Sequence, residues 1–133
     1  MRTSPHFNIV VRITACAVLV CLLLFGLPSI YRAQLQAEAK RCANGDGKQI
    51  VELVKDYDRK NGKLPNELTD IREVPLALFI GWNYLPMESH DFGLYRYIGF
   101  YRVSVDYRES RDSVGSSGWF INDENEGERP LEP

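Results

Sequence analysis

One uncharged apolar segment near the N-terminus constrains this chain more than any other feature. It runs from Ile13 to Leu27, continues less strictly to Ile30, and is flanked by Arg12 and Arg32. Residues 13–31 amount to about 19 residues, close to the roughly 20 that a helix needs to cross a bilayer. A helix pairs all its backbone polar groups within one segment, as lipid requires. We therefore expect a transmembrane helix over 13–31, in contact with the lipid bilayer, preceded by a short cytoplasmic tail over 1–12.

A cleaved signal peptide is the alternative interpretation of the same segment. The apolar part of a signal peptide usually spans about 7–15 residues and ends close to a pair of small residues. Here the apolar run is longer, and the Ala37-Glu38-Ala39 pattern lies about ten residues beyond its end. The length therefore favours an uncleaved anchor.

The flanking charges bear on the orientation of this helix. Arg2 and Arg12 precede it, while Arg32, Lys40 and Arg41 follow it, so the positive-inside rule gives nearly equal counts. Large domains cross membranes largely regardless of charge, and a short basic tail seldom does. We expect a single-pass protein of the cytoplasmic (inner) membrane, with its C-terminal domain outside the cytoplasm.

The rest of the chain has the size and charge of one small domain. Two of the 16 Lys and Arg and none of the 18 Asp and Glu precede residue 32, which leaves 14 basic against 18 acidic residues and a net charge of −4. The two signs are interspersed, so we expect no nucleic-acid partner. Cys42 is the one cysteine of this part, so no disulfide can form within the domain. Its thiol could form a disulfide with a second copy of the chain or accept a lipid. More often, a single cysteine of this kind is simply a small residue in a helix.

Helical patterns follow the apolar segment. Residues 31–43 are good helix formers, whereas Asn44-Gly45-Asp46-Gly47 interrupts a helix. Asp46 with Gln49 fits a capping box that would start the next helix. In that helix an apolar stripe recurs at helical spacing, and we expect it to pack on the domain's own sheet. The stripe consists of Ile50, Leu53, Val54 and Tyr57, and Asn61-Gly62 ends the helix.

Beyond a short helical turn near Leu68 to Ile71, the pattern changes to that of strands. Aromatic and β-branched runs separated by Gly and polar turns are typical of short antiparallel strands. These runs are Trp82 with Tyr84, Phe92 to Ile98, Phe100 to Tyr107, and Trp119 to Ile121. Val103, Val105 and Tyr107 alternate with Ser104 and Asp106, which predicts one covered face and one wet face. We expect a polar loop over 108–118 and an acidic flexible tail over 123–133.

This arrangement resembles type II secretion pseudopilins and related pilin-like proteins. The resemblance rests on a helix followed by Tyr57-x4-Gly62-x2-Pro65-x2-Leu68-x2-Ile71, then a small aromatic-rich sheet with Trp119 near its end, and it is closest over 35–71. It implies a pilin-like α+β domain over 32–122, with an amphipathic helix that continues from the anchor and packs on a small antiparallel sheet. It also implies a structural or protein-interaction role in the cell envelope, with another envelope protein or itself as partner.

The sequence departs from the pilin-like pattern at the features that processing and assembly use. Prepilins carry a short leader ending in Gly and a Glu at the fifth mature position, but here no Gly precedes Gly26 and no acidic residue precedes Glu38. We therefore expect a protein that is neither processed nor built into a filament. Major pseudopilins also bind calcium in a loop of the sheet region, which Asn122 to Gly127 faintly resembles. Pro133 stands where a calcium loop has its last Glu, which favours a solvated tail.

Residues that could carry chemistry are few. His6 lies in the N-terminal tail, and His90 lies in Glu88-Ser89-His90-Asp91, a loop with alternating charges that we expect to be exposed to solvent. Because His90 is the one histidine of the domain and no cysteine is positioned beside it, no metal set and no nucleophile–base pair can be nominated. We therefore expect no enzyme activity, no catalytic, cofactor-binding or metal-binding residues, and no cofactor. The alternative function is a secreted or anchored ligand-binding module of the periplasm, with a pocket between helix and sheet.

Overall fold

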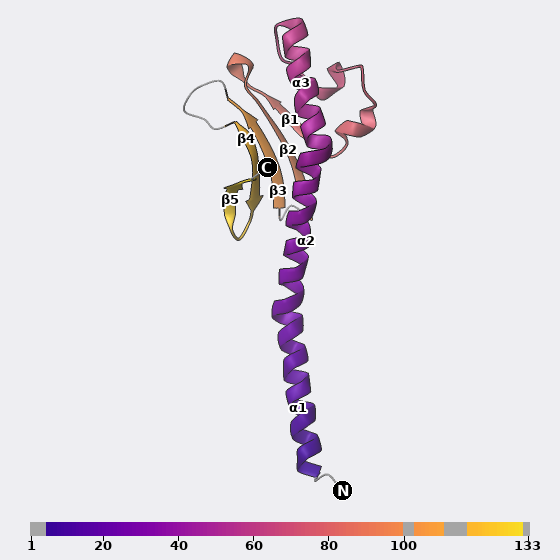
Figure 1. The fold of residues 1–133 in the computed structure, drawn as a ribbon, viewed down its shortest axis with the longest axis vertical. Coiled ribbons are helices and arrows are strands. Elements are labelled where there is room, and N and C mark those ends of the chain that lie inside the picture. The colour runs from indigo at the N-terminus through magenta and orange to yellow at the C-terminus, as the bar shows by residue number, and fades with distance from the viewer. Residues whose placement is uncertain (1–4, 100–102, 111–116, 132–133) are drawn as a thin grey trace. The chain divides into compact units, whose positions relative to one another are not determined.

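A computed structural model describes residues 5–99, 103–110 and 117–131 (Figure 1). The chain divides into two compact units, Met1–Gln34 and Leu35–Pro133. Each unit is described by itself below. Helices α1 to α3 and strands β1 to β5 carry the labels of Figure 1.

The first unit is helical throughout its described part. It comprises α1 (Pro5–Cys21), a π-helical turn (Leu22–Gly26) and the start of α2 (Leu27–Cys42). The large apolar side chains from Ile9 to Phe25 are exposed, up to 73% at Phe25. The Thr14 hydroxyl donates to the Val10 carbonyl at 2.9 Å and the Ser29 hydroxyl to the Phe25 carbonyl at 2.8 Å, so both are satisfied within the helix. Among the described residues, one helix is long and apolar enough to cross a membrane, a property that it shares with N-terminal signal sequences.

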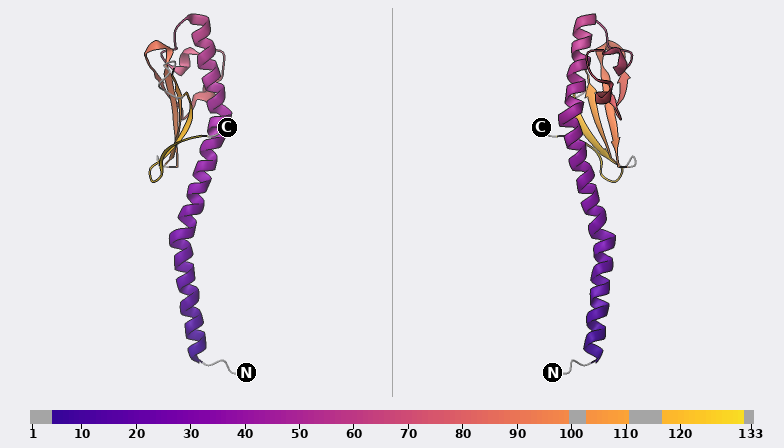
Figure 2. Two further views of the ribbon diagram at one scale, coloured as in Figure 1. Left: turned by 60° about the vertical axis from the view of Figure 1, so that its left-hand side comes forward. Right: turned by 90° about the vertical axis from the view of Figure 1, so that its right-hand side faces the viewer.

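The second unit is an α+β domain, as the sequence predicts. After α2 and a π-helical turn (Ala43–Gly47), α3 (Lys48–Asn61) lies along one face of a five-stranded sheet (Figure 2). The strands are β1 (Asn83–Pro86), β2 (Phe92–Ile98), β3 (Val103–Glu109), β4 (Gly118–Asp123) and β5 (Gly127–Pro130). All neighbours pair antiparallel, in chain order. Short 3-10 turns occur at Leu68–Asp70, Leu76–Phe79 and Glu88–His90.

The core lies between α3 and the inner face of the sheet. Ile50 and Val54 from α3 are fully buried, and Val51 is 3% exposed. The sheet contributes Phe92, Leu94, Val105 and Ile121, among others. Ile50 and Val54 of the predicted stripe are thus buried as expected, whereas Leu53 and Tyr57 are only half-buried against the core and also line a hollow beside residues 70–73. The buried stripe is therefore rotated toward Val51 and Asp58, which are more deeply buried than Leu53 and Tyr57.

The interruption between α2 and α3 takes a different form from the predicted one. Gly45 has non-helical backbone angles (φ −94°, ψ −108°), so the predicted break is present. However, no side-chain cap forms at the start of α3, so the predicted capping box of Asp46 and Gln49 is wrong. Gly47 has helical backbone angles again (φ −59°, ψ −48°) and packs against two tryptophans: a Cβ built on it would lie 2.5 Å from Trp119 and 2.7 Å from Trp82.

The acidic C-terminal segment forms a strand. The sequence predicts a flexible tail over 123–133, but Asp123 ends β4 and Gly127–Pro130 forms β5. A tight turn joins these strands, with Gly127 at φ 77°, a backbone conformation that glycine adopts without strain. The predicted polar loop over 108–118 is shorter than expected, because β3 continues to Glu109 and β4 begins at Gly118. Residues 111–116 of that loop, and residues 100–102 of the predicted third strand, lie outside the described residues.

Candidate functional site

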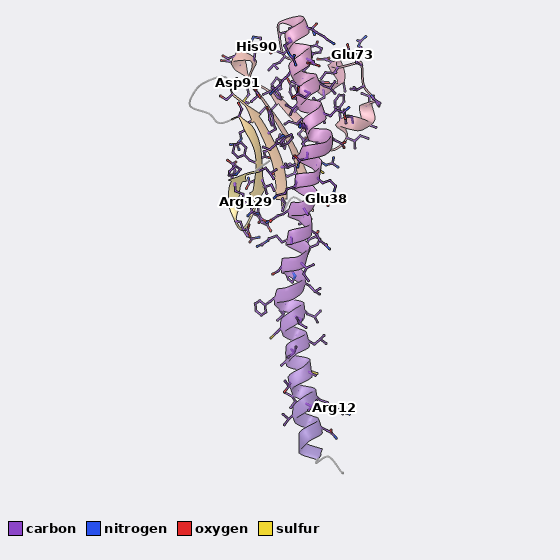
Figure 3. All side chains as sticks on the ribbon, in the orientation of Figure 1. Arg12, Glu38, Glu73, His90, Asp91 and Arg129 are labelled. Atoms are coloured by element: carbon purple, nitrogen blue, oxygen red, sulfur yellow. The ribbon has the colours of Figure 1, made fainter. Side chains whose placement is uncertain are left out.

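A carboxylate–imidazole pair lies at the C-terminal end of α3. Asp58 occupies the buried side of α3, is 8% exposed, and its Oδ1 lies 2.6 Å from Nδ1 of His90. His90 is on the 3-10 turn that precedes β2 (Figure 3). The prediction that the 88–91 loop is exposed is therefore wrong for His90 and Asp91, which are half-buried.

The backbone of this turn is strained. Ser89 and His90 have φ angles of 62° and 66°, in the left-handed region that side chains other than glycine seldom adopt. Such conformations cost roughly 1–3 kcal/mol each and persist where surrounding contacts hold them. The bond between His90 and the buried Asp58 is a contact of this kind, and it fixes the turn on α3.

An ion pair between Lys55 and Glu109 lies beside Asp58 and His90. Lys55 Nζ lies 3.0 Å from Glu109 Oε2, and the Tyr107 hydroxyl donates to the same carboxylate. Burial disfavours the Lys55 ammonium, but its bonds to Tyr107 and Glu109 outweigh this effect and raise the pKa of Lys55. Burial, together with the bond to Glu109, raises the pKa of Tyr107. Both groups therefore keep their protons at neutral pH.

These groups surround a small hollow of about 180 Å³. The described residues that line it are Lys55, Asp58, Arg59, Leu64, His90, Phe92 and Glu109. An imidazole held by a carboxylate can act as a general base, but it needs a nucleophile or a bound substrate to act on. None of these lining residues carries a hydroxyl or a thiol, and a protonated Lys55 is not nucleophilic. This arrangement is suited to fastening the turn and the sheet to α3.

The acidic segment compared above with a calcium loop has other partners. Asp123 is 2% exposed, and its Oδ1 accepts from the backbone N–H of Asn125 at 3.0 Å. Its Oδ2 accepts from Nε2 of Gln36 on α2 at 3.3 Å. Asp123 therefore shapes the β4–β5 turn and joins it to α2. Within the described part of the chain, no group of three or more His, Cys, Asp or Glu residues is placed to hold a metal ion.

Cys42 sits near the end of α2 and is half-buried against the core. Burial raises the pKa of its thiol, with nearby Arg96 acting in the opposite direction. Because the thiolate is the reactive form, this environment suits a packing residue better than a reactive one.

A larger hollow, of about 410 Å³, lies on the outer face of the sheet, away from α3. Its described lining includes Leu85, Met87, Gly93, Tyr95, Asp106 and Arg108. The register places Asp106 directly between Tyr95 on β2 and Phe120 on β4. The pocket expected from the sequence for a ligand-binding module lies between helix and sheet, whereas this hollow lies on the opposite face of the sheet. The alternation along residues 92–98 is the sequence signal that could have identified this surface, because it places Tyr95 and Tyr97 on the face of the sheet opposite to the buried Leu94 and Ile98.

Comparisons with family models, with curated proteins and with solved structures find no match to this chain.

Proposed function

We propose that this protein is a single-pass, membrane-anchored protein of the cell envelope, whose α+β domain has a structural or protein-binding role outside the cytoplasm. We propose further that it is pseudopilin-like in build but is not a filament subunit. The anchor is its central element, and the outward-facing domain carries the binding surface.

The observation that carries the proposal is that every large apolar side chain between Ile9 and Ile30 is exposed, by 49% to 73%. A soluble helix buries such residues, and each fully buried Leu, Val or Phe gains roughly 1.5–3 kcal/mol. Nineteen helical residues at about 1.5 Å each span roughly 28 Å, close to the hydrocarbon thickness of a bilayer. Tyr31 and Arg32 at one end are residue types that favour the membrane–water interface. A bilayer is the environment that matches this surface.

The pilin-like part of the proposal is supported by the residues of the motif. Gly62 ends α3 in the left-handed conformation (φ 69°), and Pro65, Leu68 and Ile71 are buried. The Tyr84 hydroxyl donates to the Pro65 carbonyl at 3.0 Å, which connects the motif to β1. The residues of the pseudopilin-like motif are thus the ones that attach the end of the helix to the sheet.

The filament role is not proposed because residues 5–37 contain no acidic side chain. An acidic residue in a membrane helix is costly and usually pairs with a partner group. In pilin-like filaments such a pair is thought to set the register between neighbouring subunits, and this apolar segment offers none. We propose a monomer or small oligomer without enzymatic activity.

The test of the anchor is extraction of membranes at alkaline pH from a bacterial host that expresses the full chain. The full-length protein should stay in the washed membranes, and its intact mass should retain the N-terminal residues. The double variant Val20→Arg with Leu23→Arg should be lost from membranes, because each central arginine costs about 2.5–3.5 kcal/mol of insertion free energy. The apolar swap Val20→Leu with Leu23→Val is the matched control. A soluble form that begins near residues 38–41 would instead identify a signal peptide.

The test of the assembly state is co-expression with a complete secretion or pilus system. Sheared surface filaments should lack the protein, while the membrane fraction contains it. Full-length chain in those filaments in stoichiometric amounts would restore the filament-subunit interpretation.

A second candidate, a ligand-binding module, is favoured by the hollow on the outer sheet face. Its sign would be saturable binding of a small molecule such as butylamine at that hollow, measured by titration of the full-length protein in micelles.

A further inference from the structure

We propose that the hollow on the outer face of the sheet binds a lysine or arginine side chain of an extended segment from a partner protein, with Asp106 as the counter-charge. The inference rests on the proposed interaction role and names the chemistry of the partner.

The shape of the surface comes from the order of side chains across the strands. Gly93 on β2 stands between Leu85 on β1 and Arg108 on β3, and its missing side chain leaves the floor of the hollow open. Tyr95 and Tyr97 follow on the same face, with ring centroids 5.6 Å apart and nearly perpendicular planes. The rings and Leu85, which is 56% exposed, form an apolar rim. An extended segment can lie across such a rim while one of its side chains enters the hollow.

The charge of the hollow is set by Asp106. Among the described lining residues the other charged side chain is Arg108. Its Nη1 donates to Glu128 Oε1 at 3.1 Å, and its guanidinium carbon lies 5.1 Å from the centre of the Phe120 ring. Its positive charge is therefore matched within the sheet. Burial raises the pKa of Asp106, and the Ser104 hydroxyl bond and Arg108 only partly offset this. A cation that approached this half-buried carboxylate would supply a further favourable charge interaction.

The neighbours of Asp106 favour a cation in particular. Tyr95 and Phe120 are its direct cross-strand partners, and the faces of aromatic rings attract Lys and Arg side chains. A carboxylate flanked by aromatic rings is thus suited to an ammonium or a guanidinium group. The domain's net charge of −4 also attracts a cationic partner and repels a second copy of the chain.

The composition of the rim favours a polypeptide over a small amine. Tyr, Met and Arg are enriched in protein–protein interfaces and Lys is depleted. The described lining holds Tyr95, Tyr97, Met87 and Arg108 and contains no lysine.

The probe is the blocked pentapeptide acetyl-Ala-Lys-Val-Lys-Ala-amide, titrated into ¹⁵N-labelled full-length protein in zwitterionic detergent micelles. Amide shifts should change on β2 and β3 around Tyr95 and Asp106, and the same peptide with both lysines replaced by norleucine should cause no such change. Asp106→Asn should weaken binding by about tenfold, the scale of one charge-assisted contact. Because burial already disfavours the charge of Asp106, this variant should unfold at an equal or higher temperature.

The matched control is Glu52→Gln, which removes the same charge from an exposed site on α3 and should leave the affinity unchanged. Equal weakening by Asp106→Asn and Glu52→Gln would reduce the effect to non-specific attraction and overturn the proposal. If butylamine binds as tightly as the peptide, the ligand of the hollow is a small amine and the proposal of a partner protein is wrong. If the protein self-associates through the same amides, the ligand of the hollow is a second copy of this chain and the proposal of a different partner is wrong. If the peptide fails to bind a chain that remains in washed membranes, this inference alone is wrong; release of the chain from membranes would instead overturn the proposed function.

Discussion

At the scale of residues, the polar groups on the inner side of the domain hold loops in place. Asp58 stands at the position of the α3 stripe where an apolar residue would be expected, four residues after the buried Val54. Its partner His90 comes from a turn 32 positions later in the chain. A charged residue on an apolar stripe could have been noticed in the sequence. Its partner could not have been identified, because the left-handed conformation of Ser89 and His90 decides where the imidazole points.

The bond between Asp58 and His90 can be tested by His90→Ala. Removing one partner leaves the buried carboxylate short of a hydrogen bond, so the free energy of unfolding should fall by about 1–3 kcal/mol. Relief of the strained turn would offset part of that loss. Urea unfolding of the full chain in micelles, followed by tryptophan fluorescence, measures it. Glu88→Ala changes an exposed residue of the same turn and should cost no more than about 0.5 kcal/mol. Equal losses of unfolding free energy in His90→Ala and Glu88→Ala would show that the bond between Asp58 and His90 does not stabilise the domain.

At the scale of elements, local pattern predicted most of the strands and α3. Alternation and β-branched residues place β2, β3 and β4 within a few residues of their predicted bounds. Strand β5 was missed because Gly-Glu-Arg-Pro has little strand propensity of its own. Its conformation follows from pairing with β4, for example Ile121 with Arg129. The rotation of the α3 stripe was missed for the same reason, since only the tertiary fold puts residues 70–73 beside Leu53.

The junction of α2 and α3 gives a test in which two effects have opposite signs. By helix propensity, Gly47→Ala should stabilise the domain by about 1 kcal/mol. The added methyl group, however, would lie 2.5 Å from Trp119 and 2.7 Å from Trp82. Overpacking of this kind costs about 1–3 kcal/mol, so we expect net destabilisation.

The fluorescence of the two tryptophans reports this site directly, in the same urea unfolding experiment. Lys48→Ala, at the next and exposed position, should change the free energy of unfolding by less than about 0.5 kcal/mol. A gain in stability for Gly47→Ala would mean that the helix does not rest on the tryptophan pair.

At the scale of the whole molecule, the sequence predicted an apolar helix and an α+β domain, and the structure confirms both. The apolar segment was predictable because about 19 uncharged residues admit few folded forms. Alternation along residues 92–98 could have placed Tyr95 on the outer face of the sheet, but it could not have placed Tyr95 beside Asp106. The lining of the hollow on that face comes from separate strands, and only the register brings Gly93, Tyr95 and Asp106 together.

Labelling single cysteines from one side of the membrane measures whether the chain is anchored with its domain outside the cytoplasm. In a cysteine-free background, Lys63→Cys marks the exposed turn after α3, and Asn8→Cys marks the N-terminal flank of the apolar segment. Spheroplasts are treated with a membrane-impermeant maleimide before and after lysis. We predict that Lys63→Cys is labelled in intact spheroplasts and that Asn8→Cys is labelled only after lysis. The reverse pattern, or labelled Lys63→Cys protein free of the membrane pellet, would contradict the account.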